Sequence, residues 1–371
     1  MDVHTVRLPI NRLLQKHSAR ETETILGFQD QNDLDAYEHS VARQFAKWIG
    51  RKHCQIVDSG TTALKLALLL AGIKPGDEVL VPDVTYYATA LPILEIGAVP
   101  VFVDADEYLV MNPEQVKKNI TSKTRAILPA HIFGHACDMK QIAELAQQHD
   151  LKLIEDCCQS HGSTFQGKLT GTFGHIAGFS FTIHKNIPAF YGGCVVYDDD
   201  AYESVVKDFF DVENDHERCV RFSRANARLS PFEVAQIKIK TAVFDMIKQS
   251  KRAMQHFYCD QLSAISGVQC FPDPAGRESV RQHFVIQVEN RDAWQQELAK
   301  YGVIVDQSYR AMHTRNLFKH GARGQYPVAD TYDKHGLHLP SYAFITKEEL
   351  EYVASSVKAV QKTLSARFSL V

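Results

Sequence analysis

Apolar and polar positions along the first 200 residues alternate between two periods. Short apolar runs such as EVLVPD (78–83) and AVPVFVD (98–104) predict buried strands. Longer segments such as MKQIAELAQQHD (139–150) carry apolar residues at helical spacing, and the runs LKLIED (151–156) and IAGFSF (176–181) predict further strands. Repeated alternation of strands and helices predicts an α/β fold, with a mostly parallel sheet of the seven-stranded type flanked by helices.

The pattern changes after about residue 230. A long helical stretch, two short strands and a final helix are predicted at 231–262, 283–289, 302–307 and 347–364. We therefore predict a large domain at 1–240, which includes an N-terminal helical segment, and a smaller α+β domain at 241–371.

Composition narrows the class of protein. The formal net charge of the 371 residues is −3, so no basic field indicates a nucleic-acid partner or an anionic membrane. The first residues lack the pattern of a secretory signal, and the apolar runs are too short to cross a bilayer. None of the eight cysteines forms a C-x-x-C pair, so we expect no metal and reduced thiols in a cytoplasmic enzyme.

Four candidate polar or aromatic groups follow predicted strands, where open α/β sheets bind ligands. SGTTAL (59–64) is typical of a phosphate-binding turn, or simply of a capped helix. Asp156 in IEDCCQSHG is either a ligand for a cationic ring nitrogen or a solvated loop charge. Lys185 in FSFTIHKN is either a desolvated nucleophile that forms a Schiff base or a surface lysine. Tyr86 in VTYYATA is either a stacking aromatic or a core residue.

The order of these groups matters more than any one of them. Pyridoxal phosphate (PLP) needs an anchor for its phosphate, an aromatic for its ring, a carboxylate for its pyridine nitrogen and a lysine for its aldehyde. All four follow in the chain, so the sequence predicts PLP as cofactor.

With these motifs, the chain resembles the DegT-type sugar aminotransferases, a PLP-dependent family within the aspartate aminotransferase fold (fold type I). The resemblance runs from about Glu38 to the C-terminal helix. The matching stretches lie at 59–90, 97–106, 131–139, 154–162, 171–174, 179–186 and 338–342.

The resemblance implies roles for individual residues. Lys185 carries PLP and shuttles a proton as the catalytic residue. The residues expected around the cofactor are Gly60, Thr61, Thr62 and Ser180 at the phosphate, Tyr86 at the ring, Asp156 at the pyridine nitrogen, Gln159 at the phenolic oxygen, and Asn226, lent to the neighbouring subunit's phosphate. The residues expected around the substrate are His184, Arg228, Tyr309 and His313. A shared asparagine implies a homodimer with composite active sites.

Two departures from the family pattern bear on the substrate and on Asn226. Phe190 and Tyr191 replace a Gly-Glu pair after the lysine, which favours a smaller or more apolar sugar that is not tethered to a nucleotide. Ala227 stands where the family has an aromatic, directly after Asn226.

The function implied is a PLP-dependent transaminase that moves an amino group, with L-glutamate as donor, to a keto or aldehyde sugar. The product would enter amino-sugar and surface polysaccharide (lipopolysaccharide) biosynthesis. One alternative is a PLP-dependent sugar dehydratase that uses His184 as base, although here the lysine position is kept. Another is a catalytically silent PLP-fold sensor, for which the chain offers no appended DNA-binding domain.

Overall fold

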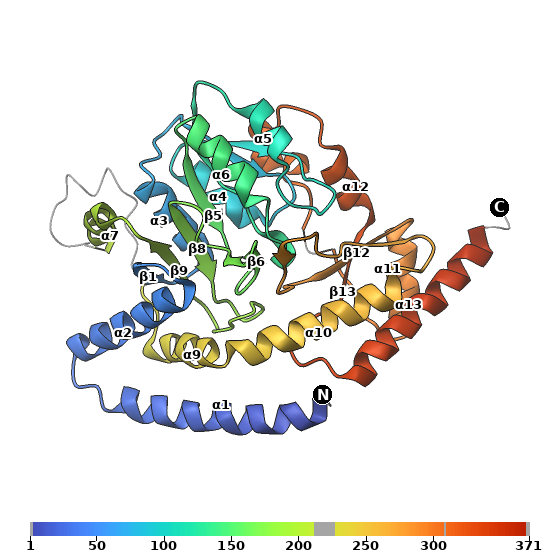
Figure 1. Cartoon of the computed structure of the whole chain (residues 1–371), viewed down its shortest axis with the longest axis horizontal. Helices are drawn as coiled ribbons and strands as arrows, with labels where there is room; N and C mark the ends of the chain where they lie inside the picture. The colour runs from blue at the N-terminus through green and yellow to red at the C-terminus, as the bar shows by residue number, and fades with distance from the viewer. Residues whose placement is uncertain (1–2, 211–226, 308, 369–371) are drawn as a thin grey trace.

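The computed structural model describes residues 3–210, 227–307 and 309–368, with side chains described within these ranges from Leu14 to Arg367. A seven-stranded sheet in the order β1-β9-β8-β5-β4-β2-β3 forms its centre (Figure 1). Its strands are β1 (His53–Val57), β2 (Glu78–Pro82), β3 (Val99–Val103), β4 (Thr124–Ile127), β5 (Lys152–Asp156), β8 (Ile176–Ser180) and β9 (Gly193–Tyr197). β9 runs antiparallel to the other six strands, which are parallel to one another, so the predicted α/β fold class is confirmed.

Helices flank this sheet, and its strands are buried accordingly: β2, β8 and β9 are buried at all five positions. Continuous burial explains the unbroken apolar runs in the sequence. The flanking helices are α2 (Gln31–Ile49), α3 (Gly60–Leu70), α4 (Tyr87–Glu95), α5 (Pro113–Asn119), α6 (Met139–Gln148) and α7 (Glu203–Phe210). Helix α1 (Val3–Leu26) lies along the lower edge in Figure 1 and contacts α9 (Pro231–Ala242).

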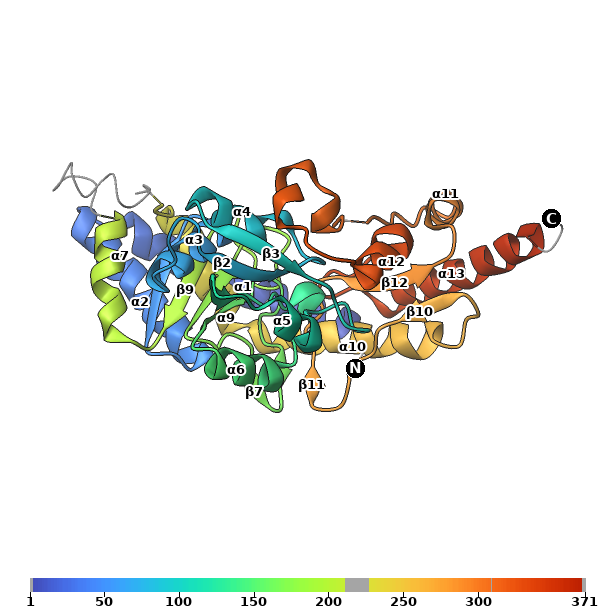
Figure 2. The ribbon, with the colours of Figure 1, turned by 90° about the horizontal axis from the view of Figure 1, so that it is seen from above.

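A second, antiparallel sheet consists of β10 (Val268–Cys270), β12 (Phe284–Val288) and β13 (Gly336–Leu339). Helix α10 (Phe244–Leu262) runs from the large sheet toward this sheet, and the two sheets occupy opposite halves of the molecule in Figure 2. The remaining helices here are α11 (Arg291–Lys300), α12 (Pro327–His335) and α13 (Lys347–Phe368). The division at residues 240 and 241 falls near the end of α9 and stays a prediction.

Short elements complete the described chain. A third small sheet pairs β6 (Thr164–Phe165) with β7 (Lys168–Leu169) and β11 (Arg277–Glu278). Four 3-10 turns are η1 (Ile132–Gly134), η2 (Asp200–Tyr202), η3 (Met312–Thr314) and η4 (Asn316–Gly321). Within the described ranges, no helix combines the length and the apolar character that a membrane span requires.

Two predicted elements differ from the structure. The single helix predicted at 231–262 is divided at Val243, whose φ of −105° and ψ of 10° leave the helical region. The strand predicted at 302–307 was wrong: in the described part of this segment only Asp306 forms a bridge, to His338. The strand that pairs with β12 there is β13, which was not among the predicted elements.

Candidate active site

A cavity of about 360 Å³ lies at the edge of the large sheet where its parallel strands end. The segments that follow β1, β2, β4, β5 and β8 all contribute to its lining, as the carboxyl-end rule for open α/β sheets requires. It brings together nine of the predicted site residues: Gly60, Thr61, Tyr86, Asp156, Gln159, Ser180, His184, Lys185 and Tyr309.

The turn between β1 and α3 is packed tightly against the end of β8. Ser59 caps α3, since its Oγ accepts a hydrogen bond from the backbone N–H of Thr62 at 3.1 Å. A Cβ on Gly60 would lie 2.6 Å from the Cβ of Ser180, so no larger residue fits without movement. The glycine therefore lets the first N–H groups of α3 approach the cavity beside the Ser180 hydroxyl.

Asp156 ends strand β5 and is 7% exposed. Its carboxylate accepts hydrogen bonds from the Thr89 hydroxyl at 2.8 Å and from the backbone N–H of Cys158 at 3.0 Å. Thr89 is itself 2.8 Å from the Thr85 hydroxyl. These bonds fix the carboxylate at the cavity wall. Sequence reasoning missed Thr89, although it lies three residues after Tyr86, on the same face of the start of α4.

Gln159, Tyr309 and His283 form a directed chain of hydrogen bonds. The Gln159 Oε1 accepts the backbone N–H of Phe133, so its amide nitrogen donates to the Tyr309 hydroxyl at 2.9 Å. The Tyr309 oxygen also lies 3.2 Å from Nε2 of His283. Burial holds the pKa of His283 well below its usual value, which favours the neutral imidazole; its Nε2 accepts a hydrogen bond from the phenol when the proton of the ring is on Nδ1. His283 was not among the predicted residues.

Lys185 belongs to the loop that joins β8 to β9. Its backbone N–H donates to the Thr182 carbonyl, and its side chain lines the cavity. Burial lowers the pKa of the Lys185 amine, and the nearby Cys158 and Asp156 offset part of that effect. A larger fraction of the amine is therefore unprotonated, and hence nucleophilic, than in a surface lysine.

Tyr86 stands at the start of α4 with 41% of its surface exposed. Its ring centroid lies 5.5 Å from that of Tyr309 at 66° and 4.5 Å from that of Tyr87. Burial of its hydroxyl end raises the pKa of Tyr86 to about 12. The ring lines the cavity rather than filling the core, as a stacking role requires.

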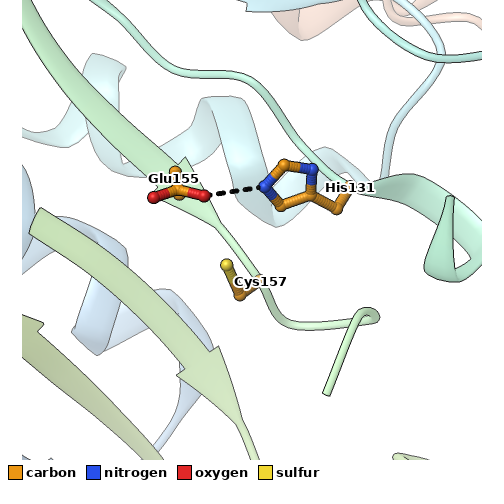
Figure 3. Close-up of side chains that lie close together, drawn as sticks. All are labelled: His131, Glu155 and Cys157. Atoms are coloured by element: carbon orange, nitrogen blue, oxygen red, sulfur yellow. Dashed lines mark hydrogen bonds and ion pairs between the residues drawn. The ribbon is translucent and has the colours of Figure 1, made fainter. Parts of the chain in front are cut away.

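His131, which lines the cavity, lies close to Glu155 and Cys157, and all three side chains are buried (Figure 3). Nε2 of His131 is 3.1 Å from Glu155, and Nδ1 accepts the backbone N–H of Cys137. Glu155 also accepts three backbone N–H groups, from residues 171, 173 and 174. Because these polar atoms already have hydrogen-bond partners, the cluster stabilises the end of β5, next to Asp156.

Of the four other predicted residues, the three that the structure describes do not line this cavity. Thr62 faces Ser59, with 2.9 Å between their hydroxyl oxygens. Arg228 forms an ion pair with Asp35 at 2.7 Å, and Nδ1 of His313 lies 2.7 Å from the Asp83 carboxylate. Asn226 lies outside the described residues. The roles expected for these four side chains stay predictions.

The residues at the cavity fit PLP. A phosphate would find helix N–H groups at a turn where a Cβ would clash, and a ring nitrogen would find a buried, hydrogen-bonded carboxylate. An aldehyde would find a desolvated lysine. Among the residues that the structure describes, no other lysine lines this cavity.

Comparisons with known proteins agree with this geometry. The model of the "DegT/DnrJ/EryC1/StrS aminotransferase family" matches residues 16–358 of this chain. The dTDP-3-amino-3,6-dideoxy-alpha-D-galactopyranose transaminase of Aneurinibacillus thermoaerophilus is 30% identical over 364 residues, which cover 96% of this chain and 98% of that protein. The UDP-N-acetyl-3-dehydro-alpha-D-glucosamine 3-aminotransferase of Acidithiobacillus ferrooxidans is 33% identical over 81% of this chain and 82% of its own length.

Solved structures give the same result. The crystal structure of DesV from S. venezuelae, in complex with a ketimine intermediate, superposes with a TM-score of 0.86 at 28% identity and covers 97% of each chain. The expectation of a PLP-dependent aminotransferase is thereby confirmed. The chain belongs to the DegT/DnrJ/EryC1/StrS aminotransferase family.

Proposed function

We propose that this aminotransferase moves an amino group from L-glutamate to a keto or aldehyde sugar. The observation that carries the proposal is the placement of Lys185, whose pKa is lowered by burial, in one cavity with Asp156. The sugar substrate is supported by the relatives, which are named as sugar transaminases.

We assign the cofactor contacts from the cavity geometry. PLP, when bound, supplies an electron sink that lets an amino group and a proton leave the donor carbon. Asp156 would hold the ring nitrogen protonated, and Tyr86 would lie against the ring. Gly60, Thr61 and Ser180 would hold the phosphate, with Thr62 supporting the turn through Ser59. Gln159 would face the phenolic oxygen.

Lys185 would act as the proton carrier. Its lowered pKa increases the fraction of free amine, which can accept a proton from the donor carbon and then return it. Tyr309 would help to position Gln159, because its hydroxyl accepts the amide N–H. His184 also lines the cavity and would contact the substrate.

Two further substrate residues need a change of partner to act. Arg228 would have to leave Asp35 or serve the site of a second subunit, and it is 48% exposed at its side chain. His313 is paired with Asp83 and with Asp330 at 3.2 Å, and this pairing raises its pKa. We propose Arg228 and His313 as outer substrate contacts.

We propose that the sugar is nucleotide-linked. The relatives are named for dTDP-, GDP- and UDP-linked sugars. Phe190 and Tyr191 are each 67% exposed and do not line the cavity, so in this structure they do not narrow it. The expectation of a smaller, free sugar therefore loses its main support.

We further propose a homodimer with shared active sites, working in the cytoplasm and supplying amino sugar for a surface polysaccharide. Exposed apolar side chains gather in the two segments beside the cavity: Tyr86, Tyr87, Ile183, Phe190 and Tyr191. Such a cluster is typical of a surface that another subunit covers. Every described cysteine is a free thiol, as in a reducing compartment.

The test is a coupled assay of the purified protein. A panel of keto sugars, each in free and nucleotide-linked form, is incubated with L-glutamate and PLP, and both 2-oxoglutarate and the aminated sugar are measured. Equal amounts of the two products are expected with at least one nucleotide-linked sugar. A Lys185→Ala variant is the control and should form neither. If the panel gives dehydrated sugar and no 2-oxoglutarate, the protein is a dehydratase and the proposal is wrong.

A further inference from the structure

A second cavity, of about 500 Å³, adjoins the cofactor cavity. The two share His184, Lys185, Gln282 and His283, so the second opens directly onto the catalytic lysine. Helix α10, the loop after β8 and the segment that follows β13 form its walls. A volume of this size accommodates a small ligand.

The lining of this cavity contains a buried lysine that has no charged partner among the described residues. Lys251 on α10 is 4% exposed, and its amine donates to the backbone carbonyl of Ser341. Burial alone lowers its pKa to about 8, and no neighbouring charge contributes. Lysines are seldom buried to this extent unless they are paired. Lys240 lines the same cavity, whereas Asp306, the acid in its lining, is exposed.

The lining of this cavity also includes two residues with buried acceptors that no described donor reaches. The Oδ1 of Asn186 and the Oε1 of Gln282 have no hydrogen-bond partner among the described residues. Their amide nitrogens donate to the carbonyls of Val280 and His184, so the amides cannot be flipped without losing those bonds. Unsatisfied buried acceptors cost about 1–3 kcal/mol each, and a ligand that donates hydrogen bonds recovers this cost.

These groups are complementary to a zwitterion. A free amino acid brings a carboxylate for Lys251 and an ammonium group for the two amide oxygens. A phosphate group would satisfy the lysine but would leave both acceptors unpaired. We propose that the second cavity is the docking subsite for the amino donor. Lys251 binds a carboxylate of the donor. Gln282, which lines both cavities, binds the amino group of the donor and directs it toward Lys185. The identity of the ligand as donor rests on the proposed function.

The first experiment measures binding without catalysis. Glutarate, a dicarboxylate that cannot be transaminated, is titrated into the PLP-loaded protein by calorimetry. Lys251→Met should weaken its binding by about tenfold or more, because the charge-assisted bond is lost. Lys248→Met, the same substitution on the same helix but outside the cavity lining, should bind glutarate as the wild type does. Lys251→Gln, which keeps a polar side chain, serves as a second uncharged variant should the methionine variant not fold.

The second experiment separates the two substrates. In steady-state assays Lys251→Met should raise KM for L-glutamate by about tenfold or more while KM for the sugar stays within about twofold. Equal glutarate binding by the wild type and both Lys251 variants would overturn the subsite, as would a rise in KM confined to the sugar. Glutarate binding that depends on Lys251, in a protein that fails to aminate any sugar, would retain the subsite and refute only the proposed function.

Discussion

Replacing Thr89 with valine tests how the acid of the cofactor site is held. Thr89 is 2% exposed, and its hydroxyl donates to Asp156 at 2.8 Å while lying 2.8 Å from the hydroxyl of Thr85. Because a carboxylate only accepts, the protons run in one direction, from Thr85 to Thr89 to Asp156. Valine keeps the branched shape and removes the final donor.

The magnitude follows from the bonds that remain. A hydrogen bond to a charged group contributes about 1.5–3 kcal/mol. Asp156 keeps the N–H of Cys158 at 3.0 Å, so the lower end of that range applies. About 1.4 kcal/mol corresponds to a tenfold change in rate. We therefore expect Thr89→Val to slow amino transfer by about tenfold, because the carboxylate is less firmly held against the ring nitrogen.

The assay is a single-turnover reaction of the PLP-loaded protein with saturating L-glutamate, followed by the absorbance of the cofactor. Thr85→Val is the matched control: it removes a bond one step farther from Asp156 and should slow the reaction by less than about threefold. Circular dichroism would verify that both variants are folded. A folded, cofactor-saturated Thr89→Val protein that reacts at the wild-type rate would refute the positioning role of Thr89.

Three further predictions concern Gly60, Tyr309 and Lys251. Gly60→Ala places a Cβ 2.6 Å from the Cβ of Ser180. It should lower the free energy of unfolding by about 1–3 kcal/mol, measured by denaturant unfolding, and weaken PLP binding, measured by cofactor titration. Gly324→Ala is the control and should change neither quantity, because no atom lies within 4 Å of the added Cβ. Tyr309→Phe removes the partner of Gln159 and His283 and should lower kcat by about tenfold; an unchanged kcat would place Tyr309 outside the catalytic network. Because Lys251 is charged below its pKa of about 8 and neutral above it, KM for L-glutamate should rise as pH rises through that value. If the Lys251→Met protein shows the same rise in KM, the pH dependence belongs to Lys185, Lys240 or another group of the lining.

The sequence predicts the site residues best where a residue of distinctive chemistry directly follows a buried strand. Unbroken apolar runs in the sequence predict the buried strands. The residues at the carboxyl ends of these strands lie at the same edge of the sheet, because the strands are parallel. For this reason Gly60, Asp156 and Lys185 could be predicted from the sequence, and they lie in one cavity.

The residues that were missed act through tertiary contacts. Thr89 is informative only because Asp156, 67 positions later, accepts its hydrogen bond, and His283 only because Tyr309 folds against it. Nothing in the sequence near Lys251 marks it as buried, since a lysine on a helix is usually solvated. Conversely, Arg228 and His313 have the right residue types but are paired with Asp35 and Asp83.

The measurement that tests the account most directly is the mapping of the lysine that carries PLP. The purified protein is loaded with PLP and reduced with borohydride, and its peptides are analysed by mass spectrometry. We expect the pyridoxyl label on Lys185 alone. A label on another lysine, or an unlabelled Lys185 in protein that retains full activity, would contradict the assignment of this cavity as the active site.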